Sequence, residues 1–288
     1  MKICPHCEAR FDRPDWTCPV CGRQPQGDRF LMFAPELDAS DEGFELTSFA
    51  QLAQLEPTSF WFRARNRLVA QLIRRHFPDA RKLLEIGSGT GYVLAGLRRT
   101  LPQLELVGAE LHTAGLRFAS ERLPGVELYQ MDARHIPFES EFDVVSALDV
   151  IEHIDDDSRV LGEMHRATRP GGGLIVSVPQ HRWLWSAADD FAHHVRRYRR
   201  RDLAARVEGA GFKVIQITSF VTTLLPFLAA SRRRQSSLDE YDPGGEYRLP
   251  RVVDRVLEGT LEAERFLIAR GLSLPAGGSL FVVGRKPA

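Results

Sequence analysis

The sequence has no cysteine after residue 21, although its 288 residues include four cysteines. A disulfide framework needs cysteines spread over the fold, so the rest of the chain has none. The sequence also has no excess of either charge, because 38 Lys and Arg residues balance 38 Asp and Glu residues. No overall field therefore gathers nucleic acid or an anionic membrane, and such a partner needs a local basic patch.

Long apolar runs are also missing. The longest one, over residues 220–230, contains Pro226 and is shorter than the roughly 20 residues that a transmembrane helix needs. No basic segment followed by an apolar one opens the chain, so we expect a cytoplasmic protein without a transmembrane segment. Its 43% hydrophobic and 26% charged residues are typical of a globular protein with one large core and a small appendage.

The four cysteines form two pairs, Cys4 with Cys7 and Cys18 with Cys21, each with two residues between its members. This spacing can bring four thiolates around one Zn²⁺, which would supply the folding free energy that so short a segment cannot obtain from an apolar core. Four thiolates leave no open coordination position, so the predicted zinc is structural. His6 is an alternative ligand, whereas a redox-active motif would contain only one such pair within a βαβ unit.

The sequence divides into a zinc ribbon at 1–24, a linker at 25–46 and one large domain at 47–288. Helical spacing of apolar residues over 47–77, interrupted at Pro57, predicts two helices. Short apolar runs then alternate with helical stretches, which predicts an α/β fold with a doubly wound, seven-stranded, mostly parallel sheet. The predicted strands lie at 82–86, 105–109, 126–129, 142–147, 173–178, 212–218 and 279–285. An insertion at 220–278, before the last strand, contains an apolar segment, a polar loop (232–245) and a helix (250–269).

A glycine-rich turn, Gly87-Ser88-Gly89-Thr90-Gly91, directly follows the first predicted strand of the sheet. Glycines allow the backbone to bend sharply and a ligand to approach it closely. Glu110 ends the next strand, 19 residues after Gly91, where a carboxylate can accept both hydroxyls of a ribose. The spacing of the turn differs from the GxGxxG of dehydrogenases, but the turn and Glu110 alone leave a dinucleotide and S-adenosylmethionine both open.

Five segments together resemble the motifs of the class I S-adenosylmethionine-dependent methyltransferases. They are Glu85 to Gly91, Gly108 to Glu110, Gln130 to Ala133, Phe142 to Ile154, and Arg169 to Gly173. Two further segments, Phe60 to Arg65 and Asp189 to Tyr198, are similar to a bacterial, largely uncharacterised subgroup of that family. The resemblance implies a Rossmann-like fold with strand order 3-2-1-4-5-7-6, an antiparallel last strand and S-adenosylmethionine as cofactor.

The resemblance also implies a set of cofactor-binding residues, among which Asp132 corresponds to the residue that contacts the adenine amino group. The set comprises Arg65, Glu85, Gly87, Ser88, Gly89, Gly91, Glu110, Leu111, Asp132, Ala133, Leu148, Asp149 and Val150. From the residues themselves, the aromatic helix that bears Arg65 can fold over the cofactor, with this arginine facing the methionine carboxylate. Trp61 and Phe62 of that helix can equally well be ordinary packing residues.

Methyl transfer does not require a general base. If one is used, His153, which follows the fourth strand, is the first candidate, because a histidine titrates near the working pH. The alternative that the resemblance implies is a structural or cofactor-contacting histidine. A predicted acceptor wall follows the fifth strand, with a solvated loop as the alternative. It comprises His181, Asp189, His193, His194 and Tyr198. Two arginine runs, within 196–201 and at 232–234, can grip an anionic acceptor or an anionic lipid surface, or can cap helices.

We therefore predict methyl transfer to a small-molecule or lipid-linked acceptor. RNA is the alternative acceptor, since a four-cysteine ribbon before such a domain also resembles some ribosomal RNA methyltransferases. A third possibility is a non-catalytic binding module that docks a protein partner through the ribbon. Intact Gly87, Gly89, Glu110 and Asp132 argue against lost cofactor binding. The protein partner of the ribbon, the methylated atom and the oligomeric state cannot be read from the sequence.

Overall fold

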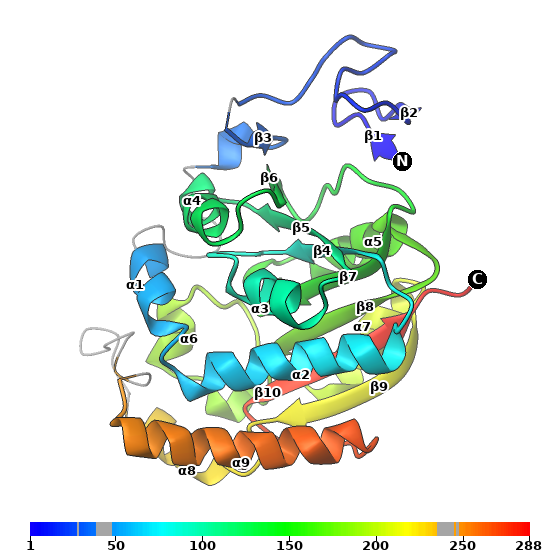
Figure 1. Ribbon diagram of the computed structural model, residues 1–288. Helices are drawn as coiled ribbons and strands as arrows, with labels where there is room; N and C mark the ends of the chain where they lie inside the picture. The colour runs from blue at the N-terminus through cyan, green and yellow to red at the C-terminus, as the bar shows by residue number, and fades with distance from the viewer. Residues whose placement is uncertain (28, 39–47, 235–244, 246–247) are drawn as a thin grey trace.

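The main sheet of the computed structural model contains eight strands in the order β3-β6-β5-β4-β7-β8-β10-β9 (Figure 1). The structure describes residues 1–27, 29–38, 48–234, 245 and 248–288. In sheet order, the strands are β3 (Leu31–Met32), β6 (Glu127–Gln130), β5 (Glu105–Glu110), β4 (Lys82–Ile86), β7 (Phe142–Leu148), β8 (Thr168–Pro179), β10 (Ser279–Arg285) and β9 (Lys213–Phe220). Only β10 runs antiparallel to its neighbours. The predicted fold class and the predicted order of seven strands are thus confirmed.

The strand count of seven was wrong by one, because β3 adds an eighth strand at the edge of the sheet. It lies within the range predicted as a linker and pairs in parallel with β6 through Leu31 opposite Tyr129 and Met32 opposite Gln130. Two residues are too few to show a period-2 pattern, so no sequence signal marks this strand. Its place depends on long-range contacts.

Helices cover both faces of the sheet, as the alternation of side chains along a strand requires. Leu83 of β4 packs in the core formed with α2 (Phe60–His76), α3 (Tyr92–Thr100) and α9 (Arg251–Ala269). Leu84 packs on the opposite face, with α5 (Asp157–Ala167) and α7 (Arg200–Gly209). The remaining elements are α1 (Ser48–Leu55), α4 (Thr113–Arg122), α6 (Ala187–Phe191), α8 (Leu225–Arg234) and the 3₁₀ turns η1 (Pro35–Leu37), η2 (Ile151–His153) and η3 (Arg182–Leu184).

The four-cysteine segment, residues 1–24, contains the short hairpin of β1 (Lys2–Ile3) and β2 (Arg10–Phe11) and packs against the β6 side of the sheet. Its Trp16 is buried, with ring-centroid distances of 4.6 Å to Phe33, 6.0 Å to Tyr129 and 5.4 Å to Phe138. The Ile3 backbone N–H donates to the Pro137 carbonyl at 3.0 Å. The segment therefore shares a core with the large domain.

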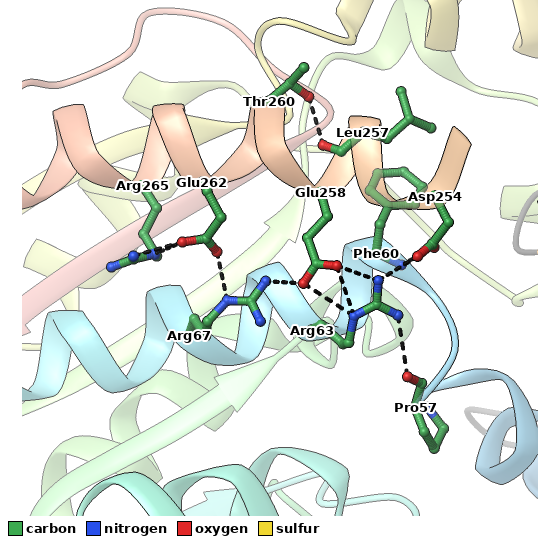
Figure 2. Close-up of polar contacts among 10 residues, drawn as sticks. All are labelled: Pro57, Phe60, Arg63, Arg67, Asp254, Leu257, Glu258, Thr260, Glu262 and Arg265. Carbon is green, nitrogen blue, oxygen red and sulfur yellow. Dashed lines mark hydrogen bonds and ion pairs between the residues drawn. The ribbon is translucent and has the colours of Figure 1, made fainter. Parts of the chain in front are cut away.

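Helix α9, in the predicted insertion, lies along α2 and is joined to it by charged side chains (Figure 2). Arg63 donates from Nε to Glu258 at 3.1 Å, and Arg67 donates from Nε to Glu262 at 2.6 Å. Asp254 accepts the backbone N–H of Phe60 at 2.7 Å, which satisfies one of the unpaired donors at the start of α2. The α9 helix thus fixes both the position and the beginning of α2.

Parts of two predicted segments lie outside the described residues, namely 39–46 of the linker and 235–244 of the polar loop. Among the helices that the structure describes, none is long and apolar enough to cross a bilayer.

Candidate functional site

A cavity of about 1000 Å³ opens where β4, β5, β6 and β7 end. The carboxyl ends of parallel strands meet at one edge of a sheet, and α1, α6 and α8 supply further walls. Most of the predicted site residues line this cavity. They are Arg65, Glu85, Gly87, Ser88, Gly89, Glu110, Leu111, Asp132, Ala133, Leu148, Asp149, Val150, His153, Asp189 and His194.

The glycine-rich turn forms the floor of the cavity beside β4. Gly87 has a φ of +67°, and a Cβ on it would lie 2.4 Å from Cγ2 of Val150. Gly91 has a φ of +74° and lies behind the cavity, where a Cβ would meet Leu123 at 2.8 Å. Both positions favour glycine because of the positive φ and because a Cβ would collide with a packed side chain, Val150 after β7 or Leu123 after α4.

Glu110 holds the turn from the end of β5. Its carboxylate accepts the backbone N–H of Gly89 at 2.9 Å and that of Leu111 at 2.8 Å. Burial raises the pKa of this carboxyl, and the backbone donors oppose that shift. The backbone N–H of His112 also donates to it, at 3.3 Å. A carboxylate has about four acceptor positions, so Glu110 keeps acceptor capacity for a ligand in the cavity.

Asp132 follows β6 and faces the same cavity. It accepts the guanidinium Nε of Arg134 and the backbone N–H of Arg134, both at 2.9 Å. Arg134 also lines the cavity and was not predicted from the sequence. The Arg134 side chain thus balances the negative charge of the Asp132 carboxylate and fixes its orientation.

Glu85, Arg65 and Asp149 form a charged group behind the glycine-rich turn. Arg65 is ion-paired with Asp149, and its guanidinium carbon lies 4.4 Å from the ring centroid of Trp61. Glu85 is buried, and its Oε2 has no hydrogen-bond partner within the described chain. Burial raises the pKa of Glu85 to about 8, although the positive charge of Arg65 acts to lower it. Without a ligand, Glu85 is therefore mostly protonated at neutral pH.

The far wall carries three groups from η2 and from the loop after α6. Burial lowers the pKa of His153 to about 3, so its imidazole is neutral at physiological pH. Glu152, which the sequence did not single out, is fully buried, and this burial raises its pKa well above the ordinary range. Burial opposes ionisation of Asp189, but hydrogen bonds from His194 and Arg197 lower its pKa to about 2. Because Asp189 is therefore ionised, Nδ1 of His194 donates to it, at 2.8 Å.

The cavity wall does not include three of the predicted acceptor residues, His181, His193 and Tyr198. His181 stacks on Trp183 with a centroid distance of 5.4 Å, and His193 is exposed. The Tyr198 hydroxyl is buried and donates to Asp157 at 2.7 Å.

The arginine run at 196–201 is mostly engaged by the protein itself. Arg196 donates to the Ile154 carbonyl, and Arg200 donates to the Ile217 carbonyl. Arg197 lines the cavity and is paired with Asp189 at 2.7 Å. In this run, Arg197 is the arginine that faces the site.

The sequence interpretation missed the aromatic wall residue Phe49 of α1, because no motif connects that helix to the cavity. Phe227 of α8, in contrast, belongs to the apolar segment at 220–230 that the sequence marked as part of the insertion, and it lines the cavity.

Comparison with known proteins places these features in a family. A family described as a methyltransferase domain matches residues 59–217. A probable S-adenosylmethionine-dependent methyltransferase of Mycolicibacterium smegmatis is 29% identical over 184 residues, which cover 62% of this chain and 68% of the relative. Phthiotriol/phenolphthiotriol dimycocerosates methyltransferase 1 of Mycobacterium ulcerans is 33% identical over 182 residues, which cover 59% and 67%.

A solved structure shares the fold. Phosphoethanolamine N-methyltransferase 2 of Haemonchus contortus, in complex with phosphomonomethylethanolamine and S-adenosylhomocysteine, aligns with a TM-score of 0.53 and 21% identity. The alignment covers 77% of this chain and 53% of that one.

The raised pKa of Glu85 predicts a pH dependence of stability in the ligand-free protein. The unfolded chain releases this proton near pH 4.5 and the folded chain near pH 8, so stability falls as pH rises between these values. Glu85→Gln is expected to remove this loss, which amounts to roughly 2–3 kcal/mol between pH 5.5 and 7.5. Urea unfolding of the wild type and the variant at both pH values measures the difference.

Glu208→Gln, at an exposed glutamate of α7, is the matched control and should leave the pH dependence unchanged. Equal pH slopes for the wild type and Glu85→Gln would contradict the assignment.

Proposed function

Because the chain belongs to the methyltransferase-domain family and is an S-adenosylmethionine-dependent methyltransferase, we propose that its methyl acceptor is a small molecule or is linked to a lipid. One observation carries the proposal. Beyond the glycine-rich turn, the cavity continues along an apolar wall formed by Val221, Leu224, Phe227, Leu228 and Leu257. Such a wall suits an acceptor with substantial apolar surface.

The relative from Mycobacterium ulcerans, named as a methyltransferase of dimycocerosates, is consistent with an apolar acceptor. The balance of 38 basic and 38 acidic residues gives no support to RNA. Two arginines that line this part of the cavity are also engaged, since Arg197 is paired with Asp189 and Arg232 donates to the Ser186 hydroxyl at 3.2 Å.

For the cofactor, we propose that Glu110 accepts the ribose hydroxyls and Asp132 the adenine amino group. Gly87 and Gly89 let the cofactor approach the backbone. Arg65, which lines the same cavity, is placed to bind the methionine carboxylate of the cofactor. S-adenosylmethionine carries positive charge on its sulfur and its amino group, and two carboxyls line the cavity beside Arg65. Asp149 complements that charge, and the positive charge of a bound cofactor would also favour the ionised form of Glu85.

Methyl transfer requires the acceptor atom and the methyl group to be held in line, so positioning supplies most of the catalysis. A general base works best when its pKa lies near the working pH. With a pKa of about 3, His153 is poorly suited to take up a proton. Its neutral ring is better suited to contact the acceptor, together with His194 and Asp189.

We also propose that the four-cysteine segment is a structural zinc ribbon. The Sγ atoms of Cys4 and Cys21 lie 3.6 Å apart, as do those of Cys7 and Cys18. Tetrahedral zinc with Zn–S bonds of about 2.3 Å requires S–S separations of about 3.8 Å. His6 is outside this group of four.

If the zinc proposal is correct, elemental analysis of the purified protein should find one zinc ion per chain. Chelation should lower the thermal unfolding temperature of the whole chain by roughly 5 °C or more, because Trp16 leaves the shared core when the segment unfolds. Cys18→Ser should behave like the chelated wild type. An unchanged unfolding temperature after complete loss of zinc would contradict the proposal.

The ribose assignment predicts that Glu110→Gln weakens binding of S-adenosylhomocysteine by about ten-fold or more, because a charged acceptor is lost. Glu110 also holds Gly89, so a 2′,3′-dideoxy analogue serves as the control ligand. The variant should bind this analogue nearly as well as the wild type does. An equal loss for both ligands in calorimetry would mean that Glu110 acts only through the turn.

The acceptor class is tested by transfer of labelled methyl from S-adenosylmethionine into a host extract, followed by separation of RNA, protein, lipid and small molecules. We expect label in the lipid or small-molecule fraction with the wild type and none with Glu110→Ala. Label in RNA or protein would overturn the proposed acceptor.

A further inference from the structure

Three potential metal ligands converge on the far wall of the cavity. Glu152 and His153 belong to η2, and His194 belongs to the loop after α6. One ligand atom from each lies within 4.8 Å of the other two. Oε1 of Glu152 is 4.0 Å from Nε2 of His194, and the two imidazole rings are 4.8 Å apart at 77°. The group is separate from the four cysteines.

Glu152 lacks the partners that a buried carboxyl needs. Its exposed fraction is 0%, and neither carboxyl oxygen has a hydrogen bond within the described residues. Nδ1 of His153 is also buried without a partner among them. A buried carboxyl without a hydrogen-bond partner is strongly unfavourable, so an arrangement of this kind calls for a further group between these atoms.

His194 is already oriented as a ligand. Its Nδ1 is held by Asp189 at 2.8 Å, which turns Nε2 toward Glu152. Asp189 is itself fixed, because it accepts the Ser186 backbone N–H at 2.9 Å and the Arg197 guanidinium at 2.7 Å. A carboxylate that holds the distal nitrogen of a histidine is the usual support of a metal-binding imidazole.

We propose that Glu152, His153 and His194 bind one divalent transition-metal ion at the wall of the cavity. Two imidazoles and one carboxylate suit manganese, iron, cobalt or zinc better than calcium or magnesium. Two ligands that are each about 2.1 Å from one ion lie at most about 4.2 Å apart. The Glu152–His194 pair already meets this limit, and the third ligand needs to move by less than about 1 Å.

Three protein ligands leave coordination positions open toward the cavity. An acceptor hydroxyl can occupy one of them, and the metal lowers the pKa of such a hydroxyl. Its proton passes to water, and the oxygen lone pair then forms the bond to the methyl carbon as the carbon–sulfur bond breaks, which leaves S-adenosylhomocysteine. This consequence rests on the proposed function, whereas the metal site itself does not.

The test is a titration of the full chain with Mn²⁺, followed by calorimetry and electron paramagnetic resonance. Elemental analysis first confirms one zinc per chain, and the four thiolates do not favour manganese. We expect one Mn²⁺ per wild-type chain, with nitrogen hyperfine coupling from imidazole. His194→Ala and Glu152→Gln should each weaken binding by at least about ten-fold.

His193→Asn is the matched control, because His193 is the exposed neighbour of His194 and asparagine tolerates its φ of 54°. It should bind Mn²⁺ like the wild type. Unchanged binding in His194→Ala, or no stoichiometric Mn²⁺ in the wild type, would overturn the site.

S-adenosylhomocysteine binding is measured on every variant, which separates the two proposals. A chain that binds this ligand but no Mn²⁺ refutes the metal site alone. A wild type that binds Mn²⁺ but not the ligand refutes the proposed function alone. Should Glu152→Gln fail to fold, the wild type and His194→Ala still decide the outcome.

Discussion

The hydrogen bond from the Gly89 backbone to Glu110 joins the glycine-rich turn after β4 to the end of β5. Both strands are parallel neighbours, so this bond fixes the two loop ends at the same edge of the sheet. The positive φ of Gly87 and the contact of the turn with Val150 connect that edge to β7. The other segments that line the cavity surround these three strand ends.

Helix α2 links the site to the part of the chain inserted before the last strand. Arg65 faces the cavity, whereas Arg63 and Arg67 of the same helix face α9 (Figure 2). Asp254 of α9 also holds the first residue of α2. The position of a cavity-facing arginine thus depends on a helix nearly 200 residues away in sequence, and the insertion serves both as a wall of the cavity and as a support for α2.

Local patterns in the sequence predicted the strands, the glycine-rich turn and the carboxylate at the end of the second strand. The sheet order and most of the cofactor-site residues followed from the resemblance to class I methyltransferases. The sequence could not separate His194 from His193. His193 has a left-handed backbone conformation, and the two adjacent side chains lie in different environments, that of His194 half-buried beside Asp189 and that of His193 exposed. Tyr198 was predicted at the acceptor wall, but its hydroxyl is taken by Asp157, a residue 41 positions earlier. Among the described residues, the carboxyl oxygens of Glu152 have no hydrogen-bond partner, and this property depends on tertiary packing, which no sequence motif predicts.

The outermost strand β3 and the four-cysteine segment occupy the side of β6 that would otherwise end the sheet. A free strand edge is a template on which another chain can add a strand, and proteins commonly block it. Here the edge of β6 is covered by β3 and by residues 1–24 of the same chain, and the rings of Trp16 and Phe33 pack together at 4.6 Å between centroids. The amino-terminal segment therefore acts as a built-in guard against edge-to-edge aggregation, at a site remote from the chemistry.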